Sequence, residues 1–172
     1  MSDRYVSDAM REAIGRQLAR RVSFPVSESD IRRWAIAVYY PDEPPQWFWN
    51  ADAARKSQYS GIVAPQEFNP FAWMVAERSH SPSVAGHDAS DRTELLLGID
   101  GPGLKFQLNG GIDTEYGVAM RPGDVITSVT RLAGYYERQG RLGLMLFTVS
   151  EDVWTNQAGE LVKRTRHTLI RY

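Results

Sequence analysis

The sequence VITSVTRLAGYYERQGRLGLMLFTVSEDVWTNQAGELVKRTRHTLIRY, residues 125–172, decides the fold. It contains long runs rich in β-branched and aromatic residues, which favour strands. Two short polar segments with glycine, RQGR at 138–141 and NQAG at 156–159, divide these runs and are typical of tight turns. The pattern predicts long antiparallel strands joined by hairpins. The run at 142–149 is apolar throughout, so we expect it at the centre of the sheet.

A further strand, IDTEYGVAM at 112–120, precedes these runs and ends at the turn RPGD, residues 121–124. Between residues 68 and 76, apolar side chains recur at helical spacing. Either Pro65 or Pro70 is expected in the first turn of this helix, and Asn69 is its N-cap if the helix begins at Pro70. A sheet with one apolar face needs a cover, and this helix is the candidate. The sequence therefore predicts an α+β protein with a hot-dog fold, in which a curved antiparallel sheet wraps around a central helix.

The first part of the chain is expected to be helical. Apolar residues at every fourth position predict a helix within residues 1–20, and Gly15, inside this pattern, is a candidate for an earlier end. Ser27 begins a capping pattern for a second helix that must end before Pro41. The polar segment 79–103 is expected to be a surface excursion, in which TELLLGI, residues 93–99, favours a strand. All 172 residues are expected to form a single domain.

Composition excludes several classes of function. The chain has no cysteine, so disulfides and cysteine-based metal sites are excluded. Its three histidines, His80, His87 and His167, lack the paired spacing of zinc ligands, so we expect no metal. A net charge of −1 gives no field to attract nucleic acid, and no apolar run is long enough to cross a membrane. With no signal-peptide pattern at the N-terminus, the protein is expected to be cytoplasmic.

The segment YYPDEPPQWFWNADAARKS, residues 39–57, is the most unusual part of the sequence. Its three prolines exclude a helix or a central strand, so it is predicted to be a loop. The loop carries two carboxylates, Asp42 and Glu43, followed by three adjacent aromatic residues at 47–49. Side chains of this kind are costly to leave in water, so we expect them to line a pocket or contact another subunit.

Several segments, in this order, resemble one protein family. They are SESDIRRWAIAV at 27–38, the loop PDEPPQWFWNADAAR at 41–55, GIVAPQEF at 61–68, and the sheet segments at 108–124 and 155–170. The chain resembles the MaoC-like hydratases and dehydratases, and more closely the FAS1-like dehydratase domain of mycobacterial 3-hydroxyacyl dehydratase subunits. The resemblance implies interconversion of a trans-2-enoyl thioester and its (R)-3-hydroxyacyl counterpart. The substrate would be an acyl-CoA or acyl-carrier-protein thioester, with no further cofactor.

The resemblance also shows where this chain departs from the family. Active members carry a motif close to Gly-Asp-x-Asn-Pro-x-His, which places the catalytic aspartate at Asp42. Pro41 stands where the family has glycine, Pro44 where it has asparagine, and Trp47 where it has histidine. A tryptophan cannot transfer a proton at neutral pH, so the acid–base pair is incomplete. The family's Ala-Pro-Gly, whose glycine N–H stabilises the enolate oxygen, becomes Ala-Pro-Gln, ending at Gln66.

Some MaoC-like dehydratases combine two unequal hot-dog domains, of which one carries the Asp/His pair and the other shapes the acyl cavity. This chain resembles the second kind. We therefore expect it to associate with another hot-dog subunit, a copy of itself or a catalytic MaoC-like chain. It would supply the acyl pocket and the interface. The resemblance implies the following substrate-binding residues: Trp47, Phe48, Trp49, Ala64, Pro65, Gln66 and Phe68.

Two other functions remain open at this stage. Glu67, at the start of the central helix, suggests a hot-dog thioesterase in which a carboxylate attacks the thioester or activates water. The missing histidine also fits a non-catalytic acyl-binding subunit. The basic residues Lys163, Arg164 and Arg166 are candidates for the coenzyme A phosphates, although such clusters are more often solvated strand faces.

Overall fold

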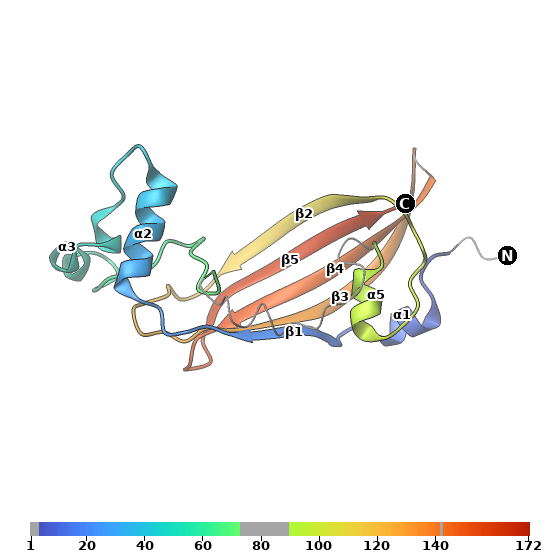
Figure 1. Ribbon diagram of the computed structural model, residues 1–172, viewed down its shortest axis with the longest axis horizontal. Helices are drawn as coiled ribbons and strands as arrows, with labels where there is room; N and C mark the ends of the chain where they lie inside the picture. The colour runs from blue at the N-terminus through green and yellow to red at the C-terminus, as the bar shows by residue number, and fades with distance from the viewer. Residues whose placement is uncertain (1–3, 73–89, 142) are drawn as a thin grey trace.

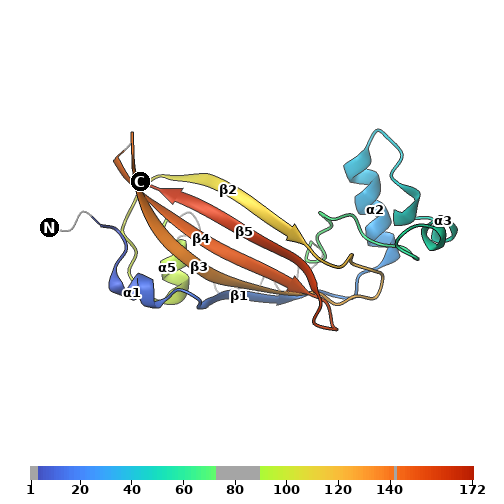
Figure 2. The ribbon, with the colours of Figure 1, turned by 180° about the vertical axis from the view of Figure 1, so that it is seen from behind.

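The computed structural model describes residues 4–72, 90–141 and 143–172. One five-stranded sheet, in the order β1-β3-β4-β5-β2, forms the middle of the elongated molecule, with α2 and α3 beyond one of its ends and α1 and α5 at the other (Figures 1 and 2). The strands are β1 (Gln17–Val22), β2 (Gln107–Tyr116), β3 (Thr127–Gly140), β4 (Gly143–Thr155) and β5 (Leu161–Arg171). The helices are α1 (Asp8–Glu12), α2 (Glu28–Tyr39), the 3-10 helix η1 (Gln46–Phe48), α3 (Ala51–Lys56) and α5 (Arg92–Leu97).

The strands predicted in the last third of the chain are confirmed, and β4 lies at the centre of the sheet between β3 and β5. The strand predicted at 112–120 forms as β2 but begins and ends earlier, at Gln107–Tyr116. The turn after β4 forms as expected: Asn156 Oδ1 accepts hydrogen bonds from the N–H groups of Ala158 and Glu160, and Gly159 adopts a positive φ of 79°. The turn before β4 lies later than predicted, because β3 continues to Gly140. The α+β hot-dog architecture is thus built mainly from the last third of the chain.

The helix expected within residues 1–20 is present as α1, but it is shorter than the apolar spacing predicts. α1 ends at Glu12, and Gly15 takes a positive φ of 89° while its N–H donates to the carbonyl of Leu132. The chain then enters β1, which pairs antiparallel with β3. The fourfold apolar spacing that suggested one long helix is divided between a short helix and an edge strand, because pairing with β3 outweighs local helical preference.

The second helix is confirmed as α2. Ser27 Oγ accepts the N–H of Asp30 at 3.1 Å, and Ile31 and Ala35 are fully buried. Val38, about one turn after Ala35, is by contrast 57% exposed. The reason is the position of α2, which projects beyond the end of the sheet so that its last turn has no strand to pack against (Figure 1).

The expected central helix, residues 68–76, lies partly outside the described residues. The part that is described forms turns, and Asn69 Oδ1 accepts the N–H of Phe71 at 3.0 Å, as expected for a helix cap. In the segment 79–103, of which residues 90–103 are described, TELLLGI is not a strand. It forms α5, which ends at Gly98 in the left-handed conformation and buries Glu94 and Leu97.

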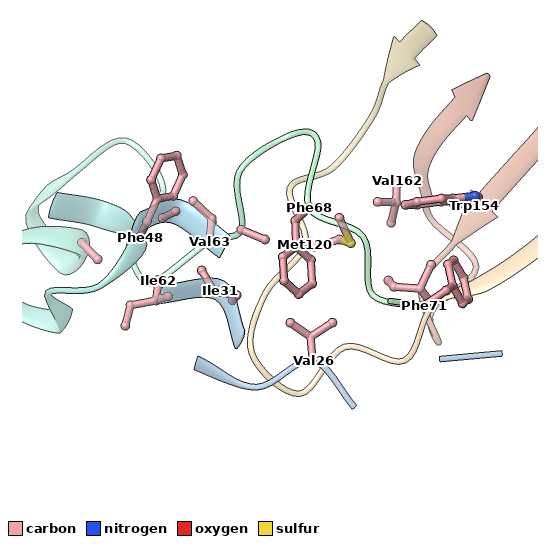
Figure 3. Packing of buried hydrophobic residues seen from close by; sticks show 14 residues of the cluster. Val26, Ile31, Phe48, Ile62, Val63, Phe68, Phe71, Met120, Trp154 and Val162 are labelled. Carbon is pink, nitrogen blue, oxygen red and sulfur yellow. The ribbon is translucent and has the colours of Figure 1, made fainter. Parts of the chain in front are cut away.

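The apolar residues gather in two clusters of unequal size. The larger cluster lies between α2, the loop after it and one end of the sheet, and Figure 3 shows Phe68 at its centre with Phe71 and Trp154 towards the strands. The smaller cluster consists of Ala13, Leu97 and Leu132 with partly buried neighbours, and it lies at the opposite end of the sheet. The larger cluster is the one that shapes a cavity.

Candidate binding cavity

A cavity of about 810 Å³ lies where α2 and η1 meet the ends of β2 and β5. This volume is in the range of pockets that hold small organic ligands. Its apolar wall includes four aromatic side chains from separate segments: Tyr39, Trp47, Tyr59 and Tyr116, with Phe48 as a fifth on the same loop as Trp47. The remaining lining residues are Gln58, Val63, Ala64, Pro65, Gln66, Gly117, Val118, Ala119, Met120, Arg121, Asp124, Asn156, Gln157, Ala158, Glu160 and Val162.

The proline-rich loop forms one wall of this cavity. After Pro45 the chain turns into η1, which buries Phe48 and leaves Trp47 half-buried beside it at a ring-centroid distance of 5.8 Å. Trp47 also contacts Tyr59 at 6.0 Å, and Asn50 caps α3 directly after the aromatic residues. These contacts fix the rings against one another, so the wall is preformed.

A second wall comes from the segment that leads to Phe68. The N–H of Ala64 donates to the carbonyl of Met120 at 2.9 Å. This hydrogen bond attaches the segment to the loop that follows β2. Ala64 and Pro65 are buried, whereas Gln66 is exposed. Five of the seven expected substrate-binding residues line the cavity, and their roles in binding remain predictions. They are Trp47, Phe48, Ala64, Pro65 and Gln66.

Three other candidate residues lie outside the cavity lining. Phe68 is 1% exposed and packs edge-on against Trp34 in the core, so it supports the wall from behind. Trp49 is half-buried, and its Nε1–H donates to the carbonyl of Pro44. Asp42 has an exposed side chain, and its N–H donates to the carbonyl of Tyr39 at 2.8 Å. The catalytic role of Asp42 remains a prediction.

The rim of the cavity is polar and was not anticipated from the sequence. It comes from two turns, which contribute Arg121 and Asp124 on one side and Asn156, Gln157 and Glu160 on the other. Gln157 Nε2 donates to Asp124 Oδ1 at 3.1 Å, which joins the two turns. Both turns were predicted as turns, but nothing in their sequences indicates that they lie together at a cavity.

The basic residues of β5 are all paired with carboxylates. Lys163 Nζ lies 2.9 Å from Glu67 Oε2 and faces the rings of Tyr116 and Trp154 at 5.5 and 5.1 Å. Arg164 pairs with Glu115 at 2.7 Å, and Arg166 pairs with Glu151 at 2.8 Å. Lys163 is buried, contrary to the solvated face that such clusters usually form.

The histidines contribute nothing to the cavity as far as the structure describes it. His167 is exposed on β5, while His80 and His87 lie outside the described residues. No histidine is among the described residues that line the cavity. Within the described ranges, no group of three or more metal-binding side chains is present. None of the helices in those ranges combines the length and apolar character of a membrane-spanning segment.

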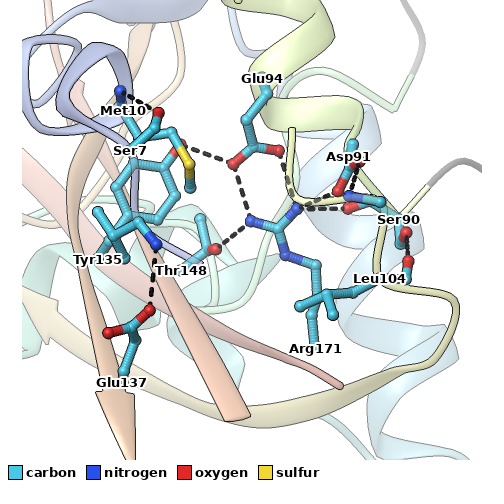
Figure 4. Close-up of polar contacts among 12 residues, drawn as sticks. Ser7, Met10, Ser90, Asp91, Glu94, Leu104, Tyr135, Glu137, Thr148 and Arg171 are labelled. Atoms are coloured by element: carbon cyan, nitrogen blue, oxygen red, sulfur yellow. Dashed lines mark hydrogen bonds and ion pairs between the residues drawn. The ribbon is translucent and has the colours of Figure 1, made fainter. Parts of the chain in front are cut away.

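A separate polar cluster lies at the opposite end of the sheet, where Arg171 and Glu94 are both fully buried (Figure 4). The Arg171 guanidinium donates to both carboxylate oxygens of Glu94 at 2.8 Å, to Asp91 at 2.9 Å and to Thr148 Oγ1 at 2.8 Å. Tyr135 OH donates to Glu94 Oε1 at 2.7 Å. These bonds attach α5 to three strands of the sheet.

Burial alone would raise the pKa of Glu94, but the hydrogen bonds and charge of Arg171 outweigh it and hold this pKa below its ordinary value. Burial, together with the hydrogen bond to Glu94, raises the pKa of Tyr135 well above its ordinary value. The carboxylate is therefore ionised and the phenol neutral at pH 7. Both terminal nitrogens of Arg171 and both oxygens of Glu94 are engaged within the cluster, while the buried Nε–H of Arg171 has no hydrogen-bond partner among the described residues. The cluster therefore serves mainly the fold.

The curved five-stranded antiparallel sheet with its flanking helices defines the chain as a hot-dog protein. A family model of the FAS1-like dehydratase domain region matches residues 12–165, so the chain belongs to this family. Among curated proteins, none shows significant sequence similarity to it.

Solved structures share this fold at low sequence identity. The MaoC-like dehydratase from Rhodospirillum rubrum is 19% identical, with a TM-score of 0.53 over 90% of each chain. The ChsH1-ChsH2 complex from Mycobacterium tuberculosis is 19% identical, with a TM-score of 0.59 over 90% of this chain and 83% of the other. The HadBC (3R-hydroxyacyl-ACP dehydratase) complex from the same organism is 20% identical, with a TM-score of 0.52 over 91% and 99%.

Proposed function

We propose that this chain is a subunit of an (R)-specific enoyl-thioester hydratase, or 3-hydroxyacyl-thioester dehydratase, that supplies the acyl pocket while a partner subunit supplies the Asp/His pair. The observation that carries the proposal is the composition of the cavity. Trp47 occupies the position of the family's histidine and forms part of an aromatic wall, and no described lining residue is a histidine. The wall can hold an acyl chain, but the described lining lacks the histidine that the family's Asp/His pair requires.

The reaction needs two proton transfers, which this chain leaves to its partner. In hydration, a base removes a proton from water as the oxygen adds to C3 of the enoyl thioester, and a proton is delivered to C2. The role of this chain is to bury the acyl group against Trp47, Tyr59 and Val63, so that the thioester is held in one orientation. Burial of apolar surface supplies about 25 cal/mol per Å² towards that binding.

The free edge of β2 supports association with a second hot-dog subunit. In the part of the chain that the structure describes, β2 pairs only with β5, and all ten of its residues are exposed. Exposed apolar side chains follow this edge: Leu108 is 50% exposed and Ile112 is 55% exposed. An unpaired edge of this length is a template for another strand. The related ChsH1-ChsH2 and HadBC structures are themselves complexes of two different subunits.

The test is to assay the purified chain alone, and then together with a MaoC-like chain that carries an intact Asp/His motif, on crotonyl-CoA and longer enoyl-CoA substrates. We expect no hydration by this chain alone and activity when the partner is present. Hydration by this chain alone, abolished by Asp42→Ala, would show that the chain is itself catalytic and would overturn the proposal.

The thioesterase alternative is tested in the same assay. Glu67 is bound to Lys163 and is not part of the described cavity lining, so we expect no release of free CoA. Release of CoA that is lost in Glu67→Gln would instead assign a hydrolytic function to this carboxylate.

A further inference from the structure

We propose that Arg121 binds a phosphate of the thioester carrier at the mouth of the cavity; this inference rests on the proposed function. Arg121 is the one cationic side chain among the described residues that line the cavity. An acyl thioester is apolar at one end and carries phosphate at the other. The cavity has a matching arrangement of apolar and polar groups, with aromatic rings in its wall and polar groups at its rim.

The guanidinium of Arg121 is positioned by backbone atoms. Its Nη2 donates to the carbonyl of Tyr59 at 2.7 Å, and its Nη1 lies over Gly61, where an added Cβ would stand 3.3 Å away. A larger residue at position 61 would crowd the guanidinium at this contact. Tyr59 itself lines the cavity, so the hydrogen bond places the positive charge beside the aromatic wall.

The positive charge of Arg121 has no ion-pair partner among the described residues. The nearest rim carboxylate in sequence, Asp124, accepts the backbone N–H of Arg121 and the side chain of Gln157. Glu160 accepts the side chain of Asn156 at 2.8 Å. A guanidinium has five N–H donors in a planar fork that suits phosphate oxygens, so donors remain after the bond to Tyr59.

The other basic residues near the cavity are unsuited to this role. Lys163, Arg164 and Arg166 are each paired with a carboxylate within 2.9 Å. A phosphate at any of them would have to displace that carboxylate. Arg121 can therefore bind a phosphate without breaking an existing ion pair. The phosphate of phosphopantetheine is common to coenzyme A and to carrier proteins, so this chemistry fits both sources.

The experiment measures binding of three ligands to the full chain, by titration calorimetry or by the change in intrinsic tryptophan fluorescence: decanoyl-CoA, decanoyl-4′-phosphopantetheine and decanoyl-pantetheine, which has no phosphate. We expect Arg121→Gln to weaken binding of the two phosphorylated ligands about tenfold and to leave decanoyl-pantetheine unchanged. Arg121→Lys keeps the charge and should restore most of the loss. A loss limited to decanoyl-CoA would assign the contact to the nucleotide phosphates.

Arg11→Gln is the matched control, because Arg11 is a partly exposed cation on α1 at the other end of the sheet. It should leave all three affinities unchanged. Equal losses in Arg11→Gln and Arg121→Gln, or an Arg121→Gln loss that is the same for decanoyl-pantetheine, would overturn the inference. Unchanged binding of all three ligands by Arg121→Gln would overturn it and leave the proposed function intact. If the wild-type chain binds none of the three, the proposed function itself fails.

Discussion

The two ends of the sheet differ in what holds the helices to the strands. At one end, Arg171 and Glu94 are fully buried and attach α5 through hydrogen bonds between charged groups (Figure 4). At the other end, an apolar cluster around Phe68 holds α2 and the loop that follows it (Figure 3). This second end also holds the cavity of about 810 Å³ that is lined by aromatic side chains.

This difference follows from the side-chain groups that each kind of contact leaves free to bind a ligand. Buried charges are costly unless they are paired and hydrogen-bonded within the protein, so the Arg171–Glu94 pair is committed to holding α5 rather than to binding a ligand. Aromatic rings have no such requirement, and the cavity wall can keep apolar surface uncovered until a ligand buries it. Variants at the two ends should therefore separate stability from binding.

The largest effect is expected for Arg171→Ala. Removal of the guanidinium leaves Glu94 buried without its counter-ion, and breaking a buried pair in this way costs about 3–5 kcal/mol. Urea unfolding monitored by circular dichroism measures the change. In the double variant Arg171→Met/Glu94→Gln the loss should be smaller than the sum of the two single losses. Additive losses would show that the two side chains are not coupled.

The same pair makes stability depend on pH in the acid range. The pKa of Glu94 is lower in the folded protein than in the unfolded chain, so its contribution is present above the unfolded value of 4.5 and is lost as pH falls through the folded value. The difference in unfolding free energy between the wild type and Arg171→Met/Glu94→Gln should narrow as pH decreases below about 4.5. A difference that stays constant from pH 7 to pH 3 would contradict this assignment.

At the apolar end, Phe68→Ala should destabilise the protein by about 3 kcal/mol, because it leaves a void in a well-packed cluster. Phe68 supports the cavity wall without lining it, so ligand binding should also weaken through the loosened wall. Phe68→Leu is the matched variant and should recover more than half of the lost stability. A loss below 1 kcal/mol for Phe68→Ala would show that the site collapses around the smaller side chain.

The sequence predicted the parts of the fold that depend on local pattern. Strands β3, β4 and β5 follow from alternating and apolar runs between polar turns, and α2 follows from Ser27 and Pro41. β1 was not predicted as a strand, because its assignment depends on pairing with β3, which is more than a hundred residues away in the chain. The contact between Arg171 and Glu94 was not predicted either, because the two residues are 77 positions apart in sequence and no local pattern indicates that they meet.

The candidate site was also predictable only where a local pattern marks it. The row of aromatic residues at 47–49 stood out in a proline-rich loop, and two of the three line the cavity. The rim residues Arg121 and Glu160 were not identified, because each belongs to an ordinary turn. Only the folded sheet brings those two turns to one cavity.

A cavity variant should change binding more than stability. Trp47 is half-buried, so Trp47→Ala is expected to cost about 1–2 kcal/mol of stability. Loss of its ring should weaken binding of decanoyl-pantetheine about tenfold, because the ring forms part of the cavity wall. Trp49→Ala, from the same loop but outside the described lining, is the control and should leave binding within about twofold. Equal losses for both variants would show that the loop acts only as a structural support.

The smallest effect is expected at the polar end for Tyr135→Phe. The variant removes one hydrogen bond to Glu94 while Arg171 remains, so the loss should be about 1 kcal/mol at pH 7. Its pH dependence is the sharper measurement. The pKa of Tyr135 is raised in the folded protein, so its stabilising contribution is complete below the ordinary value of 10.0 and is lost as pH rises towards the folded value.

Unfolding of the wild type and of Tyr135→Phe should therefore be compared between pH 8 and pH 11. The wild type should lose its advantage over the variant above about pH 10, since the unfolded chain then ionises a phenol that the folded protein keeps neutral. Tyr136→Phe is the matched control, because its ring stacks on Phe147 on the other side of the strand from Glu94. The same alkaline change in the control would show that the effect does not come from the buried cluster.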